Sequence, residues 1–260
     1  MKTEGEKTMK TFAIVNRKGG VGKTTTAVNL AYILATSLKK RVLLIDADGQ
    51  GNASSVCPDP SGGLAGFLWG MQSFYTHCID KTDIEGLDML TASEDLDDLD
   101  LDRSVQVNYH ALRDLIDVLE EDDAYDVVVI DCPPNFSVSC LNAIAAADRI
   151  IIPADTTAYS SEGMASLVRQ IDRIRAFRPD LSVSGVLMTG VRRSDVDEDA
   201  VALMRENAPV PVFRTVIRRS DDKVRESSWA GQAVCNWSPF CNSSRDYRTW
   251  VAELAAKEGL

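Results

Sequence analysis

The chain has 260 residues, a hydrophobic fraction of 45% and a formal net charge of −11 at pH 7. This length is sufficient for one large domain with a buried core, and no apolar run approaches the roughly 20 residues that a transmembrane helix needs. The acidic balance argues against a surface that binds nucleic acid everywhere, although a local basic face can still bind phosphates. The six cysteines form no CxxC pair, which argues against a zinc ribbon or a thioredoxin-like motif.

Residues 1–9 mix charges of both signs and lack the apolar stretch of a signal peptide, so we expect a disordered tail on a cytoplasmic protein. Residues 10–260 are expected to form a single domain. Apolar runs without alternation indicate strands buried on both faces, and apolar residues at helical spacing indicate helices. In chain order, we predict a strand at 11–15, a helix at 24–39, a strand at 41–46, a short helix at 64–71, a strand at 87–91, a helix at 105–119, a strand at 125–131, a helix at 137–146, a strand at 149–154, a helix at 160–175, a strand at 182–190, a helix at 197–207, a strand at 210–217 and a helix at 245–257.

This repeated strand–helix–strand order predicts the fold class. Parallel strands joined by right-handed crossovers form an α/β fold, here a single domain with a mostly parallel central β-sheet and helices on both faces. In such folds, ligands bind beyond the carboxyl ends of the strands. The loops that follow the predicted strands are therefore the first places to look for chemistry.

The stretch "NRKGGVGKTTT" (16–26) lies between the first predicted strand and the first predicted helix, where a phosphate-binding loop is found. Its glycines allow backbone N–H groups to approach phosphate oxygens, and the helix N-terminus adds a positive dipole. Lys23 is expected to neutralise the β- and γ-phosphates, and the Thr24 hydroxyl to bind Mg²⁺. The general P-loop pattern GxxxxGK[ST] has glycine where this chain has Arg17, which is followed by a second lysine, Lys18.

Three ordered stretches carry a resemblance to a known family. "KGGVGKTT" (18–25) resembles the deviant Walker A motif of the ParA/MinD ATPases, "VLLIDADGQGNAS" (42–54) their DxDPQGN motif, and "YDVVVIDCPPNFS" (125–137) their Walker B segment. Residues 151–167 and 212–234 also resemble ParA partition proteins, so the similarity covers nearly the whole domain. The chain looks like the small ParA form, which lacks an N-terminal helix-turn-helix domain, and this implies the P-loop fold.

Two aspartates end predicted strands, and a third follows closely. An isolated carboxylate at the end of the buried strand, Asp131, is costly, so Mg²⁺ is the natural compensation; the alternative is a helix-capping acid. Asp46 is expected to lie near the same metal. Asp48 matches the family acid that positions or deprotonates the attacking water, and the alternative is an Asx-turn residue in a glycine-rich loop. Because hydrolysis of this kind depends on positioning and charge neutralisation, a mobile loop carrying Asp48 could switch it on or off.

The resemblance implies that Lys18 reaches across a dimer interface to the phosphates of the partner's ATP, which couples dimerisation to the nucleotide state. The alternative is a solvent-exposed lysine beside the loop. We therefore expect catalytic roles for Lys18, Lys23 and Asp48, and metal binding by Thr24, Asp46 and Asp131. The residues expected to contact ATP are Lys18, Gly19, Gly20, Val21, Gly22, Lys23, Thr24, Thr25, Thr189 and Arg219, the last two near the adenine.

Relatives with these motifs have several functions, and the sequence favours one of them. The C-terminal residues 246–260 carry no net positive charge and so lack the basic amphipathic helix of membrane-binding relatives. The CxxC of iron–sulfur carriers and the tyrosine-rich tail of the kinases are also missing. Cys132 and Cys140 are interpreted as small buried apolar residues. DNA partition is the remaining function.

Residues 213–225 carry four Arg and one Lys against two Asp. Such a run is usually a solvated face, but small ParA proteins bind DNA nonspecifically through arginines, and phosphate contacts of this kind are independent of sequence and strongly salt-dependent. The candidate DNA-binding residues are Arg192, Arg193, Arg214, Arg218, Arg219, Lys223 and Arg225. The chain departs from the family pattern with Gly49 where DxDPQ has proline, with "VIRR" (216–219) in place of VIPR and with a following segment that is one residue longer; the arginine that the family has after "LMTGV" could be Arg192, Arg193 or neither.

The resemblance implies a Mg-ATP-dependent homodimer in the cytoplasm, associated with the nucleoid, that binds nonspecific DNA. Its slow ATP hydrolysis is expected to be stimulated by a ParB-like centromere-binding partner, with no membrane contact. The cargo would be a plasmid, a chromosome or a conjugative element. Two alternatives are a ParA-like positioning ATPase for a protein cargo and a nucleotide-gated protein-binding switch with little turnover.

Overall fold

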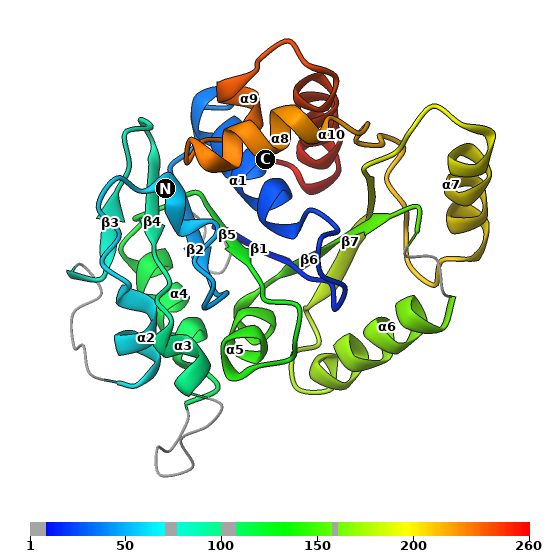
Figure 1. Cartoon of the computed structure of the whole chain (residues 1–260). Helices are drawn as coiled ribbons and strands as arrows, with labels where there is room; N and C mark the ends of the chain where they lie inside the picture. The colour runs from blue at the N-terminus through cyan, green and yellow to red at the C-terminus, as the bar shows by residue number, and fades with distance from the viewer. Residues whose placement is uncertain (1–8, 71–76, 100–107, 158–160) are drawn as a thin grey trace.

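The structure is a computed structural model that describes residues 9–70, 77–99, 108–157 and 161–260 (Figure 1). Its centre is a seven-stranded sheet in the order β3-β4-β2-β5-β1-β6-β7. All neighbouring strands pair in parallel except β3 and β4, which are antiparallel. The strands are β1 (Lys10–Ile14), β2 (Val42–Asp46), β3 (Ile79–Lys81), β4 (Leu87–Leu90), β5 (Val127–Asp131), β6 (Arg149–Asp155) and β7 (Ser182–Thr189).

Helices cover both faces of the sheet, as Figure 1 shows. The α-helices are α1 (Lys23–Thr36), α2 (Gly63–Leu68), α3 (Asp95–Asp98), α4 (Ala111–Glu121), α5 (Val138–Ala146), α6 (Ser161–Arg175), α7 (Asp195–Asn207), α8 (Asp221–Trp229), α9 (Val234–Trp237) and α10 (Asn242–Glu258), and a 3₁₀ turn spans Ser54–Val56. One apolar core lies between the sheet and helices α1, α9 and α10. A second core lies on the opposite face, under α2 to α7.

The apolar runs form strands because both of their faces are buried. In β1, Phe12 and Ile14 belong to the core under α1 and α10, whereas Ala13 on the same strand belongs to the opposite core. Fully burying a large apolar side chain contributes roughly 1.5–3 kcal/mol relative to leaving it exposed. The predicted α/β class and parallel sheet are therefore confirmed, and among the described residues no helix has both the length and the apolar character to cross a membrane.

The predicted strand at 210–217 is wrong. This segment lies beside the free edge of β7 and forms one isolated bridge with it, between Val212 and Val186. The amide of Val186 donates to the carbonyl of Pro211 at 2.8 Å, and the amide of Phe213 donates back to the carbonyl of Val186 at 2.9 Å. Farther along, the amides of Arg214 and Thr215 donate instead to the carboxylate of Glu253 on α10, at 2.8 Å and 2.9 Å, which interrupts the ladder before Ile217 bonds to β7 again.

The remaining differences are local. Four short elements, β3, α3, α8 and α9, have no predicted counterpart, and α4 begins at Ala111 rather than at 105; residues 105–107 lie outside the described residues. Met9 is 1% exposed, and its amide donates to Glu120 Oε1 at 3.4 Å. The folded domain therefore includes Met9, which was expected to belong to the tail, while residues 1–8 lie outside the described residues.

Candidate active site

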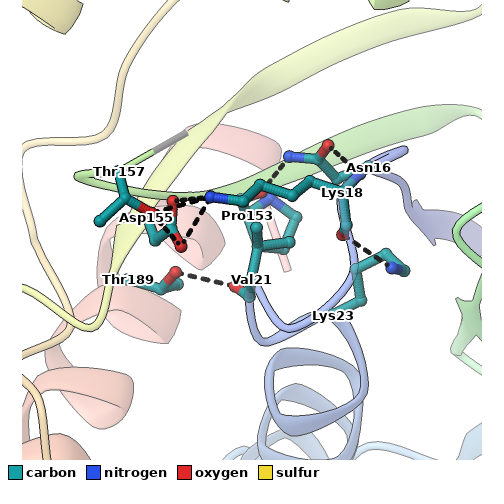
Figure 2. A network of polar contacts seen from close by, with 8 residues as sticks. All are labelled: Asn16, Lys18, Val21, Lys23, Pro153, Asp155, Thr157 and Thr189. Atoms are coloured by element: carbon teal, nitrogen blue, oxygen red, sulfur yellow. Dashed lines mark hydrogen bonds and ion pairs between the residues drawn. The ribbon is translucent and has the colours of Figure 1, made fainter. Parts of the chain in front are cut away.

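The loop after β1 has the geometry of a phosphate cradle. Gly20 and Gly22 have φ values of 75° and 84°, in the left-handed region that favours glycine, and α1 begins directly after them at Lys23. The hydroxyl of Thr189, at the end of β7, donates to the carbonyl of Val21 at 2.8 Å and fixes the middle of the loop (Figure 2). The loop thus presents backbone N–H groups and a helix N-terminus to one point, which is the arrangement that binds phosphate.

The two lysines of this loop point in different directions (Figure 2). Lys23 is 7% exposed, and its ammonium donates to the carbonyl of Lys18 at 3.3 Å, within the loop. Lys18 extends away from the loop toward the end of β6, where its ammonium lies 3.0 Å and 3.2 Å from the carboxylate oxygens of Asp155 and 2.8 Å from the hydroxyl of Thr157. Only Lys23 therefore lies under the phosphate cradle, and Lys18 is held by an ion pair within its own chain.

Asn16 fixes the start of the loop. Its side-chain amide donates to the carbonyl of Pro153 at 2.6 Å, and its Oδ1 accepts from the amide of Lys18 at 3.0 Å. The loop after β1 is thereby joined to β6, its neighbour in the sheet. Asn16 was not predicted as a site residue, although its position as the first residue of the loop is the signal that could have found it.

Two buried carboxylates face each other at the ends of neighbouring strands, Asp46 on β2 and Asp131 on β5. Asp46 accepts from the amide and the hydroxyl of Ser54, at 2.7 Å and 2.8 Å, and from the amide of Asp48 at 3.2 Å. Neither carboxylate oxygen of Asp131 has a hydrogen-bond partner of normal geometry among the described residues, and this residue is 1% exposed. An unpartnered buried carboxylate beside a phosphate cradle fits a divalent cation.

Burial raises the pKa values of both carboxyl groups. For Asp46, burial dominates over the opposing hydrogen bonds from Ser54 and raises the pKa to about 6. For Asp131, burial and then the charge of Asp46 raise the pKa well above its ordinary value, and the Thr24 hydroxyl and the Lys23 ammonium oppose this rise. The residues predicted to bind Mg²⁺ are therefore gathered around one electrostatically costly pair of acids.

This pair predicts a pH dependence of stability. Because the folded state binds these protons more tightly than the unfolded state, the pair favours folding at low pH, and this contribution is lost as the pH rises through about 6 and through the higher pKa of Asp131. Without divalent metal, the wild-type melting temperature should fall more between pH 5 and pH 8 than that of Asp131→Asn. The difference should be roughly 2–4 °C for each kcal/mol by which the acid pair lowers the free energy of unfolding. Thermal unfolding of both proteins in EDTA measures this, and equal falls would contradict it.

Asp48 lies in a cleft of about 670 Å³ together with Lys23, Thr24 and Asn52. Its Oδ1 accepts from the amide of Gln50 at 3.2 Å, so the carboxylate also forms the Asx turn that was considered as its alternative role. The two roles are compatible, because an Asx turn fixes the loop while leaving the carboxylate at the cleft. The structure therefore places Asp48 beside the phosphate cradle and at the edge of solvent.

A second cleft, of about 590 Å³, extends from the other side of the loop. Thr189 and Arg219, the residues expected near adenine, both line it, as do Gly20, Gly22 and Thr25 of the phosphate loop. Apolar surface from Ile217 and Val224 and the aromatic ring of Trp229 complete the walls. A cleft of this size and mixed polarity, continuous with a phosphate loop, can accommodate a nucleoside.

The basic residues predicted to bind DNA fall into two groups. Four are engaged in ion pairs: Arg218 with Asp246, Arg219 with Asp221, Lys223 with Glu226, and Arg225 with Asp222. The Arg218 pair is bidentate, with Nε and Nη2 at 2.8 Å and 2.7 Å from the two oxygens of Asp246. Arg192, Arg193 and Arg214 are exposed and form no ion pair within the described part of the chain.

The comparisons with known proteins agree with this geometry. A family model described as an AAA domain matches residues 9–183. The chromosome partitioning protein ParA of Caulobacter vibrioides is 34% identical over 257 residues, which cover 96% of this chain and 95% of that protein. The chromosome-partitioning ATPase Soj of Thermus thermophilus is 34% identical over 255 residues, 95% of each chain. The chain belongs to the ParA family of ATPases.

The fold of this ParA family member agrees with solved structures as well. The structure of cobyrinic acid a,c-diamide synthase from Mycobacterium smegmatis with bound ADP and magnesium superposes with a TM-score of 0.79, at 28% identity over 97% of each chain. Both the ParA resemblance and the P-loop fold class predicted from the sequence are thus confirmed.

Proposed function

We propose that this ParA family member is a Mg-ATP-dependent ATPase that dimerises around ATP, binds nonspecific DNA in the ATP state and takes part in DNA partition. The observation that carries the proposal is the pair of lysines in the phosphate loop. Lys23 lies in the cradle, whereas Lys18 is 43% exposed on its side chain and points out of it. The Lys18 ammonium lies outside the phosphate cradle of its own chain, so it is available to a second copy of the chain.

In this proposal, the loop residues Gly19 to Thr25 hold the phosphates of ATP, and Thr189 and Arg219 lie along the nucleoside. Thr24, Asp46 and Asp131 hold Mg²⁺, which neutralises phosphate charge and the unpartnered carboxylate of Asp131. Asp48 orients the attacking water or accepts its proton. These assignments are supported by the burial, hydrogen bonds and cleft lining described above.

Dimerisation exchanges the partners of Lys18. Its ammonium leaves Asp155 and Thr157 and takes a place at the phosphates in the partner's site. Because a lysine from outside the cradle adds charge where phosphate charge is concentrated, dimer formation and the ATP state become one event. The ion pair with Asp155 then stabilises the monomer against the dimer.

The proposed DNA surface is a hollow of about 580 Å³ whose lining includes Arg192, Arg193, Arg218 and Arg219, together with Asp221 and Asp222. Three of these arginines, Arg192, Arg218 and Arg219, also line the nucleoside cleft, so the two sites share a wall. Contacts from such a hollow to phosphate oxygens make binding independent of sequence and sensitive to salt. The shared wall gives nucleotide occupancy a direct physical route to the DNA surface.

We expect wild-type protein loaded with a slowly hydrolysed ATP analogue to bind a mixed-sequence duplex at least about tenfold more tightly than the ADP form at low salt. Arg192→Glu with Arg193→Glu should weaken this binding about tenfold and reduce the slope of log affinity against log salt by about two, one for each lost phosphate contact. Fluorescence anisotropy over a salt series measures both quantities.

The matched control is Arg169→Glu with Arg173→Glu, which makes the same charge change at two exposed positions on α6. An equal loss in this control would show a general charge effect rather than a site. Analogue-loaded protein that binds no better than the ADP form would contradict DNA partition and favour the protein-cargo alternative, for which the neutralised charges of α8 are the supporting observation. A ParB-like centromere-binding protein is the proposed stimulating partner in the partition role.

A further inference from the structure

Gly49, the residue after Asp48, has a carboxylate where its side chain would be. A Cβ atom on Gly49 would lie 2.9 Å from Asp97 Oδ1, 3.0 Å from Cγ and 3.2 Å from Oδ2. The three nearly equal distances place the carboxylate plane flat over this position. Gly49 is not among the residues with positive φ, so its backbone does not itself require glycine. A side chain at this position would displace the Asp97 carboxylate from its present place.

The fold brings Asp97 to this place from a different strand. It lies on the short helix α3, which follows β4. Because β4 pairs in parallel with β2, the carboxyl ends of both strands lie at the same edge of the sheet. Leu96 and Leu99, on either side of Asp97, are each 2% exposed and anchor the segment in the core. The amide of Ala92 donates to Ser54 Oγ at 2.9 Å, which joins the segment after β4 to the loop after β2.

Asp97 also lines the cleft that contains Asp48 and Lys23. Asp97 and its neighbour Asp98 are both exposed. Asp97 differs because its carboxylate packs on the backbone of the residue next to Asp48.

We infer that Asp97 is a positioning residue for hydrolysis: its carboxylate covers Gly49 and holds the loop that presents Asp48 to the cleft. This inference rests on the proposed role of Asp48 in ATP turnover. The Asp97 carboxylate occupies the volume that a side chain at position 49 would fill. Small displacements of a catalytic group have large effects on rate, on the order of 100-fold for 1 Å.

The test measures steady-state ATP turnover, with the partner protein or DNA if basal turnover is slow. In Asp97→Ala, kcat should fall about tenfold while KM for ATP changes less than about twofold, because the phosphate loop is untouched. Asp97→Asn keeps a planar group over Gly49 and should retain kcat to within about threefold. Asp98→Ala, which removes the same charge one residue away, should match wild type.

Gly49→Ala provides the second arm, since the added methyl group would displace the Asp97 carboxylate from its place over residue 49. Its kcat should fall by about tenfold, and the double variant Gly49→Ala with Asp97→Ala should be no slower than Asp97→Ala alone. Such non-additivity is the sign of a direct contact. Binding of a fluorescent ATP analogue, at one per chain in every variant, shows that lost turnover is not lost folding.

The outcomes separate this inference from the proposed function. Wild-type kcat in Asp97→Ala, equal losses in Asp98→Ala, or additive losses in the double variant would each overturn the role of Asp97 and leave the ATPase assignment intact. A wild-type protein that binds the analogue but has no turnover under any of these conditions would overturn the proposed ATPase together with the inference.

Discussion

Asp48→Ala is expected to lower ATP turnover by about 100-fold or more while ATP-dependent dimer formation persists. The carboxylate lies at the cleft beside the phosphate loop, where it can orient or deprotonate water, and general-base catalysis contributes about 100- to 10,000-fold. Its loss removes no group from the phosphate loop itself. Phosphate release assays and size-exclusion chromatography with light scattering, at saturating ATP, measure the two properties separately.

Removal of Asp48 also removes its hydrogen bond to the amide of Gln50. Asp48→Asn retains an oxygen that can accept this bond, so it separates the two roles: it should remain as slow as Asp48→Ala if the carboxylate acts on water. Asp59→Ala, at an exposed position outside the cleft, is the matched control for loss of an acid. Recovery of turnover in Asp48→Asn would reduce Asp48 to a turn residue.

Lys18→Ala is expected to abolish the ATP-dependent dimer while the affinity of the monomer for an ATP analogue stays within about threefold of wild type. The reason is geometric. The Lys18 ammonium contacts Asp155 and Thr157, whereas it is the backbone carbonyl of Lys18 that accepts from the Lys23 ammonium in the phosphate loop. Removal of the side chain therefore leaves the local phosphate site complete. Analytical ultracentrifugation measures the fraction of dimer, and titration with a fluorescent ATP analogue measures the affinity of the monomer for nucleotide.

Asp155→Asn should have the opposite effect and lower the ATP concentration needed for half-maximal dimer formation by roughly two- to fivefold. An exposed ion pair of this kind contributes at most about 1 kcal/mol, which sets the size of the shift. Arg17→Ala, one residue away in the same loop, controls for the loss of a positive charge. Normal dimer formation in Lys18→Ala would remove the proposed transfer of this lysine between chains.

Local sequence patterns were sufficient to predict the centre of this molecule. Buried apolar runs predicted β1, β2, β4, β5, β6 and β7, and the glycine-rich stretch after β1 predicted the phosphate loop, because strand propensity and loop geometry depend on adjacent residues. The two acids at strand ends were predicted on the same basis, since neighbouring parallel strands end at a common edge. The site roles given to these residues remain predictions.

What the sequence did not predict depends on contacts between distant residues. Lys18 and Asp155 are 137 positions apart, and nothing local to either residue indicates that they pair. The stretch 210–217 has a strand-like pattern, but Glu253 captures its backbone amides. Residues 213–225 have an excess of positive charge in the sequence, yet Asp246, which lies outside this run, forms an ion pair with Arg218. Tertiary partners decide all three cases.

The segment beside β7 has a consequence for how copies of this protein can associate. The edge of a sheet is a template for adding strands from other molecules, and such growth has no natural end. Here the outer edge of β7 already exchanges backbone hydrogen bonds with residues 211–219, and the opposite edge strand, β3, is only three residues long and carries Asp80 and Lys81. Intermolecular strand addition is therefore blocked at β7 and disfavoured at β3. Any association between copies of this chain therefore has to use side-chain surfaces rather than extension of the sheet.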